Sequence, residues 1–278
     1  MKAVSTVVVL SALVLAGIGA THIVQAPKQE PPAAVVVKEI SSLERARQAS
    51  FDLDMPIGAG SAVLVGRVQL EDGEYLYRAL TAHHVIAEYL ADIKLNGEDA
   101  NLDAMLTFQP EFHGEQLQID VVIDALDWLV PSGDWASFTF RHETRLECAD
   151  VATREEFRAI GAFEHIYFVA SFGPYAQQCR HGIISTTHNT GVYVDAQLTS
   201  DLPWNQQPQD FFRFSMPIWY GDSGGPIFNK DGKLIGLGNA FTVGHSMTQQ
   251  VTHSGVAVKA HIIREAVADH EDFFKMEN

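Results

Sequence analysis

Residues 219–228 read WYGDSGGPIF, a short stretch in which a serine lies between an acid and two glycines. A serine hydroxyl attacks a carbonyl only when a neighbouring base takes its proton, and the negative charge that develops needs hydrogen-bond donors. Gly221 admits the unusual dihedral angles that let its N–H and the N–H of Ser223 converge on one point. The stretch therefore predicts either a nucleophilic Ser223 with an oxyanion hole or a glycine-rich hairpin between two strands.

The base that such a serine requires must come from another part of the chain. LTAHHVI, residues 80–86, holds His83 and His84 between apolar runs. Strand alternation would turn the two rings to opposite faces, so that only one of them faces a given cleft. The alternative for either ring is a structural histidine, and a zinc pair is disfavoured because the rings diverge.

A third stretch of the sequence contains an acid that can orient the histidine. Asp134 stands at the head of the apolar run in PSGDWASFTF, residues 131–140, where a carboxylate can turn inward toward an imidazole. Other acids lie nearby, and each of them would simply face water on an alternating strand: Asp120, Asp124 and Asp127.

Together, the three stretches resemble the motifs of trypsin-like serine proteases of the chymotrypsin fold. TAHH ends on His84, DWASF begins at Asp134 and GDSGGP contains Ser223, in the order of that family and 50 and 89 residues apart. FGPYAQQCRHGIIST and GKLIGLGNAF, on either side of the serine, are similar to segments of bacterial HtrA-type members. The resemblance extends over about residues 55–265.

The resemblance implies an all-β fold of two six-stranded antiparallel Greek-key barrels, with the active site between them and a C-terminal helix. It implies that Ser223 is the nucleophile, His84 the general base and Asp134 its orienting partner, with the N–H groups of Gly221 and Ser223 forming the oxyanion hole. Such an exported serine endopeptidase hydrolyses proteins or peptides through an acyl-enzyme, with no cofactor and no metal. The alternative is a catalytically silent protein of the same fold that binds other proteins.

The chain departs from the proteins it resembles in three respects. HtrA proteins carry a PDZ domain after the protease, and we expect none here because little sequence follows residue 265. HtrA-type enzymes usually have Asn before the serine, whereas Asp222 is typical of digestive-type members, in which this acid pairs with a freshly cut N-terminus. The expected pocket residues are apolar, which disfavours Arg or Lys and favours small or medium apolar side chains of the substrate: Pro217, Ile218 and Phe241.

Short β-branched and aromatic runs separated by turn residues make up most of the chain and predict many strands. A break in the middle divides them into a first barrel at about 55–140 and a second at about 155–260, within a protease domain of residues 39–278. Helical spacing predicts one short helix over 39–51 and a terminal helix over about 260–274.

The N-terminus differs from the rest of the chain in composition. Residues 1–24 form an almost uninterrupted apolar run after Lys2, which predicts a signal peptide or a single membrane anchor. Residues 25–38 contain three prolines and charges of both signs, as in an extended linker. We therefore expect export to the periplasm or beyond, with or without attachment to the membrane.

Charge and cysteine content narrow the choice of partners and compartment. The chain has 35 acidic and 19 basic residues and a formal net charge of −16, which argues against nucleic acid and anionic lipid as partners. Cys148 and Cys179 suit an oxidising compartment, in which they form a disulfide or stay as two separate buried thiols. They lack the C-x-x-C spacing of a metal site.

Overall fold

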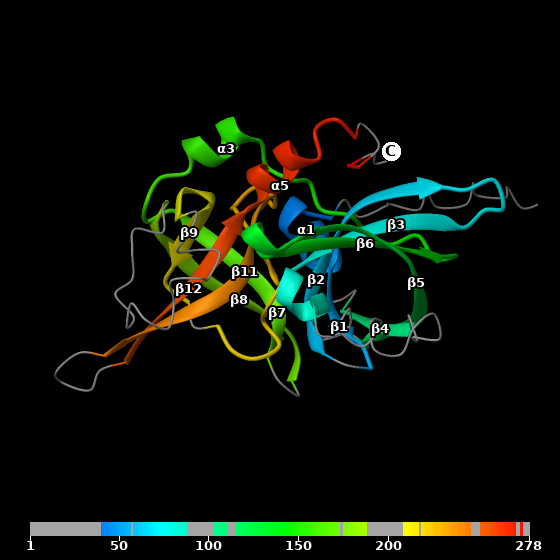
Figure 1. The fold of residues 1–278 in the computed structure, drawn as a ribbon, viewed down its shortest axis with the longest axis horizontal. Helices are drawn as coiled ribbons and strands as arrows, with labels where there is room; N and C mark the ends of the chain where they lie inside the picture. The colour runs from blue at the N-terminus through cyan, green and yellow to red at the C-terminus, as the bar shows by residue number, and fades with distance from the viewer. Residues whose placement is uncertain are drawn as a thin grey trace, which may run out of the picture. The chain divides into compact units, whose positions relative to one another are not determined.

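A computed structural model describes residues 40–56, 58–87, 103–109, 115–172, 175–187, 208–216, 218–245, 251–270 and 273–274. In these residues the strands form two closed antiparallel barrels of six strands each, and Figure 1 labels all of these strands except β10. The expected all-β class and the two-barrel architecture are confirmed.

The first barrel has the strand order β1, β2, β3, β6, β5, β4, and β4 pairs with β1 to close it. Within the described residues, each strand of this barrel therefore pairs with two neighbours, and the sheet has no edge strand. Along β5, Ile119, Val121 and Ile123 are buried while Asp120 and Val122 are exposed, which is the alternation that a barrel wall requires. The bounds are β1 (Ser50–Asp54), β2 (Ala59–Gln69), β3 (Tyr75–Thr81), β4 (Asp103–Phe108), β5 (Leu117–Val130) and β6 (Trp135–His142).

The second barrel has the order β10, β11, β12, β9, β8, β7, and β10 pairs with β7 to close it. Its interior is rich in phenylalanine, with Phe168, Phe212 and Phe214 fully buried in one cluster. The bounds are β7 (His165–Phe172), β8 (Tyr175–Thr186), β9 (Phe211–Phe214), β10 (Pro226–Phe228), β11 (Leu234–His245) and β12 (Val251–Lys259).

A further apolar cluster draws on both barrels and joins them. Val63, Leu80 and Trp135 come from the first barrel, and Phe228 and Leu237 come from the second. All five side chains are at most 1% exposed. Because close-packed side chains resist displacement, this shared cluster holds the two barrels in one arrangement. Residues from both barrels can then contribute to a single site.

The helices differ in length from those that the sequence predicts. α1 (Ser42–Gln48) begins where the Ser41 hydroxyl accepts a hydrogen bond from the Glu44 N–H. It ends well before residue 51, because the chain enters β1 at Ser50 and pairs there with β2. The helix expected over 39–51 is therefore confirmed over 42–48 and wrong at its C-terminal end, where strand pairing overrides local periodicity.

At the other end of the chain, α5 (Ala260–Ala266) is shorter than the helix expected to about residue 274. Beyond it, Phe273 is 1% exposed and packs edge-on against Trp128 of β5. Between the two barrels in chain order comes α3 (Arg154–Ala159), which has a capping box of Thr153 and Glu156.

The expected export segment, residues 1–24, and the expected linker, residues 25–38, lie outside the described residues. Across the described ranges, no helix combines the length and the apolar character needed to cross a membrane.

Candidate active site

The stretch before Ser223 forms a tight turn and not a hairpin. This turn together with Ser223, residues 219–223, is called the serine turn below. The Asp222 N–H donates to the Trp219 carbonyl at 3.1 Å, and Gly221 has φ of +96° at the third position of that turn. A positive φ there is typical of a type II turn and favours glycine. The turn presents Ser223 just before the chain enters β10.

Gly224 lets the first barrel approach the serine closely. It has φ of +81°, and a Cβ at this position would lie 2.2 Å from Thr81 Oγ1 and 2.3 Å from the Ser61 carbonyl oxygen. Any other residue would push the serine turn away from β2 and β3. The glycine after Ser223 is thus required by cross-barrel packing as well as by its own dihedral angles.

The N–H groups of Gly221 and Ser223 are the ones expected to form the oxyanion hole. Among the described residues, neither the Gly221 N–H nor the Ser223 N–H donates a hydrogen bond to the protein. Unpaired backbone donors on a tight turn are what the developing negative charge of an acyl-transfer reaction requires.

His84 comes from the segment that follows β3. Residues 83–87 form a helical turn, so the strand alternation expected to separate the two histidines does not apply. His84 Nδ1 lies 3.0 Å from each oxygen of the Asp134 carboxylate, and the His84 backbone N–H donates to Asp134 Oδ1 at 3.1 Å. The carboxylate therefore fixes both the ring and the backbone of the histidine.

Asp134 caps the short 3₁₀ helix η2 (Pro131–Gly133) in a left-handed conformation, with φ of +48°. Aspartate tolerates this conformation better than most residues. The Asp134 side chain is only 6% exposed, whereas that of His84 is 46% exposed. The acid is thus buried behind the imidazole, and the imidazole is open to a ligand.

Asn239 of β11 is a further member of the site that sequence reasoning missed. Its Nδ2 donates to Asp134 Oδ2 at 3.1 Å and to the Asp134 carbonyl oxygen, and its Oδ1 accepts from the Val258 N–H at 2.8 Å. The residue is 4% exposed and lies at a break in the register between β11 and β12. A lone amide in the apolar run of β11 was the signal that the sequence offered.

The alternative candidates lie elsewhere. Asp127 pairs with Arg78 and Asp124 pairs with Arg141, both on the outer face of the first barrel. Asp120 lines a separate groove near β1 and β4. The alternative histidine is His83. Burial lowers the pKa of its ring, and the negative charge of Asp134 opposes this shift.

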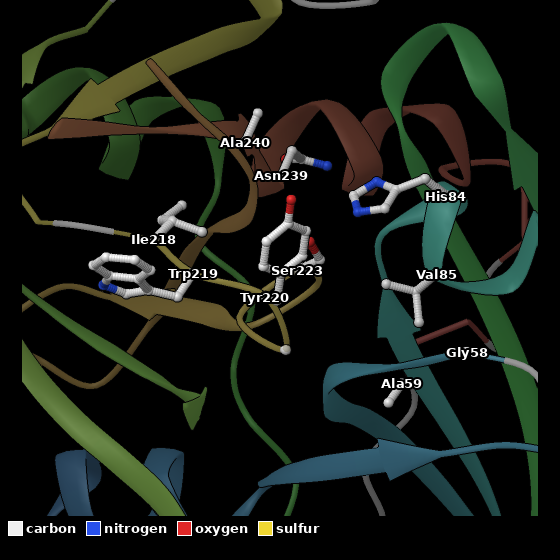
Figure 2. Close-up of a pocket in the computed structure, with 11 residues that line it drawn as sticks. Gly58, Ala59, His84, Val85, Ile218, Trp219, Tyr220, Ser223, Asn239 and Ala240 are labelled. Atoms are coloured by element: carbon white, nitrogen blue, oxygen red, sulfur yellow. The ribbon is translucent and has the colours of Figure 1, made fainter. Parts of the chain in front are cut away.

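A cavity of about 670 Å³ brings these residues to one place. Figure 2 shows His84 and Ser223 on its wall, with Asn239 beside them. Gly221 lies on the same wall. Candidate nucleophile, base and oxyanion donor therefore share one opening, although they come from different barrels.

Comparison with known proteins agrees with this geometry. The profile of the trypsin-like peptidase domain family matches residues 60–237. The chain belongs to this family. As a trypsin-like peptidase it is a serine endopeptidase, with proteins or peptides as substrates. No curated protein matches the chain significantly by sequence.

Two solved structures share the peptidase fold. Deg5 is 15% identical with a TM-score of 0.52, and the match covers 81% of this chain and 89% of Deg5. The HtrA-type protease AlgW, solved with a tripeptide, is 18% identical with a TM-score of 0.52, and the match covers 82% of this chain. The chain spans 63% of the length of AlgW.

Asp222, whose partner the sequence left open, forms an ion pair with Arg180 of β8 in the second barrel of the peptidase. The Arg180 guanidinium also lies 4.6 Å from the centre of the Phe168 ring. Burial raises the pKa of the Asp222 carboxyl, and the hydrogen bond from Arg180 opposes that shift.

The expected substrate pocket is only partly described. Ile218 is 3% exposed and lines the cavity, whereas Pro217 and the side chain of Phe241 lie outside the described part of the peptidase. Trp219 and Tyr220 are 47% and 88% exposed and also line the cavity. They add aromatic surface at the first two positions of the turn that precedes Ser223.

The two cysteines of the peptidase are both free in the structure, so the alternative of a disulfide is corrected. Cys148 packs in the core of the first barrel, where burial raises its pKa to about 12. Cys179 lies on β8 of the second barrel and is exposed. One thiol is enclosed in the core of the first barrel and the other is exposed on a strand of the second, so the two are not bonded.

Proposed function

We propose that the chain hydrolyses peptide bonds with Ser223 as nucleophile, His84 as general base and then general acid, and Asp134 as the group that orients His84. The contact of His84 Nδ1 with both oxygens of the Asp134 carboxylate, in a cavity shared with Ser223, carries this proposal. The triad order and the family membership support it.

The Asp134 carboxylate selects the useful tautomer of His84. An ionised carboxylate only accepts hydrogen bonds, so Nδ1 must carry the ring proton. The other ring nitrogen, Nε2, is then the proton acceptor that Ser223 needs. Asn239 and the His84 N–H donate to the same carboxylate and keep it aligned with the ring.

The reaction runs in two halves. Ser223 Oγ bonds to the substrate carbonyl carbon while its proton moves to His84 Nε2, and the carbonyl oxygen, now negative, accepts hydrogen bonds from Gly221 and Ser223 N–H groups. His84 then gives the proton to the leaving amine as the C–N bond breaks. A water molecule attacks the resulting acyl-enzyme with the same assistance, which releases the acid product and restores Ser223.

The cavity wall supports a preference for small or medium apolar side chains over Arg or Lys. Ile218, Val85 and Ala240 contribute apolar surface, and no carboxylate lies among the described residues that line the cavity. A cationic side chain would lose its hydration there without gaining a counter-ion. A digest of a peptide library tests this preference.

Export and membrane association also belong to this proposal. The apolar run at 1–24 would direct the chain out of the cytoplasm as a cleaved signal or a retained anchor, and the linker at 25–38 would separate the peptidase domain, 39–278, from the membrane. Fractionation of cells that produce the full chain, with N-terminal sequencing of the product, tests both forms.

A fluorophosphonate probe tests the catalytic proposal directly, because it labels a serine only when the base and the oxyanion donors activate it. The full chain should be labelled, and Ser223→Ala should not be. Absence of Ser223-dependent labelling in folded protein would favour the catalytically silent alternative, in which the same cavity only binds protein segments.

A further inference from the structure

Ser61, on β2 of the first barrel, holds the serine turn of the second barrel at two points. Its hydroxyl donates to the Gly221 carbonyl oxygen at 2.8 Å, and its backbone N–H donates to the Ser223 carbonyl oxygen at 2.8 Å. One residue thus contacts both neighbours of Asp222.

The position of Ser61 is itself well defined. The residue is 1% exposed, and its carbonyl oxygen accepts a hydrogen bond from the Thr81 hydroxyl at 2.8 Å. Gly224 closes against the same carbonyl and hydroxyl without room for a Cβ. Buried hydrogen bonds in a close-packed setting give Ser61 little freedom to follow the turn if the turn moves.

The hydrogen bond from the Ser61 hydroxyl restrains Gly221, which is the most flexible residue of the serine turn. Gly221 has no side chain, and its φ of +96° lies in a region from which glycine moves away at low cost. Its N–H has no partner among the described residues. The hydrogen bond from Ser61 to its carbonyl therefore limits rotation at Gly221 and, with it, the direction in which the N–H points.

Arg180 and Ser61 restrain different parts of the turn. Arg180 holds the side chain of Asp222 within the second barrel, whereas Ser61 holds the backbone of Gly221 from the first barrel. We propose that Ser61 is a positioning residue for the oxyanion hole: its hydroxyl keeps the Gly221 N–H directed at the reacting carbonyl. Because Ser61 belongs to the first barrel, the direction of this N–H also depends on how the two barrels pack together. This role rests on the proposed function, in which Gly221 supplies one of the two donors.

The test compares two substitutions at Ser61 with a matched control. Ser61→Ala removes the hydroxyl, and Ser61→Cys replaces it with a somewhat larger group in the same place that is a much weaker donor. Ser50→Ala is the control, because Ser50 is also fully buried in the first barrel and also donates to a backbone carbonyl, that of Ala46 at 2.9 Å, but lies outside the cavity.

Three quantities are measured on the full chain: kcat and KM for a peptide substrate, and the inhibition constant of the matching peptide aldehyde, whose adduct with the serine places an oxyanion in the hole. Both Ser61 variants should lose about 10-fold in kcat and about 10-fold in affinity for the aldehyde, which corresponds to a net contribution of about 1.4 kcal/mol from the hydrogen bond. KM should change less than about 2-fold, because the oxyanion forms only in the transition state. Ser50→Ala should keep the wild-type values of all three.

The outcomes separate this inference from the proposed function. If wild type is active and both Ser61 variants keep its kcat and aldehyde affinity, the positioning role of Ser61 is wrong while the proposed function stands. A rise in KM with unchanged kcat would also contradict the positioning role, because it would indicate that Ser61 acts in substrate binding. Should Ser61→Ala fail to fold, Ser61→Cys decides the question. A folded wild type without activity would overturn the proposed function and the positioning role together.

Discussion

The buried carboxylate of Asp222 pairs with the guanidinium of Arg180, 42 residues earlier in the chain. The Asp222 side chain is 0% exposed, and its second oxygen accepts from the Trp219 N–H at 2.7 Å. In digestive-type members a freshly cut N-terminus pairs with this acid. Here an internal strand supplies the cation, so the pairing does not depend on a new chain end.

Replacement of Arg180 by Met should destabilise the protein strongly. It leaves a buried carboxylate without its counter-ion, which typically costs about 3–5 kcal/mol. Urea unfolding measures this loss, and kcat should fall as the turn loosens. Arg141→Met is the control: its partner Asp124 is at the surface, so the loss should stay below about 1 kcal/mol. Equal losses in the two variants would contradict a special role of the Asp222 pair.

The two neighbouring histidines should differ sharply in their effect on catalysis. His84→Ala should abolish hydrolysis of a peptide substrate, because none of the other described residues that line the cavity is a base in contact with Asp134. His83→Ala should spare most of kcat. Loss of activity in the His83 variant with activity retained in the His84 variant would refute the assignment.

Replacement of Asp134 by Asn should lower kcat by on the order of 10⁴, because an amide favours the wrong tautomer of the imidazole. Steady-state kinetics at neutral pH measures the effect. Asp124→Asn and Asp127→Asn, on the outer face of the first barrel, should stay within about 2-fold of wild type. A small effect at Asp134 with a large one at either control would identify a different acid.

Asn239 should affect kcat because its side chain donates a hydrogen bond to the carboxylate of Asp134. Asn239→Ala removes a donor to the carboxylate, and we expect about a 10-fold lower kcat with KM nearly unchanged. Asn229 gives a matched control, since it is 8% exposed and its side chain also hydrogen-bonds to the backbone, but in the turn after β10. Asn229→Ala should lower the melting temperature and leave kcat unchanged; an equal fall in kcat would argue against the role of Asn239.

Acidification should destabilise the fold through His261 of α5. Burial lowers the pKa of this ring from 6.5, and Glu265 opposes the shift. A histidine that resists protonation when folded contributes stability above its unfolded pKa, and that stability is lost as the pH falls through the folded value. Melting temperatures from pH 7.5 to 5 should therefore fall less steeply in His261→Phe, which keeps the ring contact with Phe157, than in wild type. Parallel curves would rule out His261 as the source.

Local pattern was enough to predict the elements whose side chains alternate regularly. The β-branched and aromatic runs predict many strands, and one such run, residues 117–130, forms β5. Residues 39–51 read as a helix but divide into α1 and β1, since pairing with β2 outweighs helical spacing. For His83 and His84 the strand pattern was wrong, because the chain turns into a helix after Thr81.

Within the candidate site, the sequence indicated the residues that lie in recognisable short motifs: His84, Asp134 and Ser223, with Gly221 beside the serine. For the residues that support them it offered at most the lone amide of Asn239 in an apolar run, and no motif that links this residue to Asp134. Asn239 lies 105 positions from Asp134, and Ser61 lies 160 positions from Gly221. Such contacts carry no local periodicity or motif, so no short window of sequence contains them.

The sequence by itself thus determined the barrel-forming pattern and the reactive groups, because alternation and turn chemistry are properties of neighbouring residues. Only the tertiary structure decided that Arg180 neutralises Asp222, that Asn239 holds Asp134 and that the two thiols stay apart. These outcomes depend on tertiary structure because barrel closure and the apolar cluster that the barrels share bring together side chains that are far apart in the sequence.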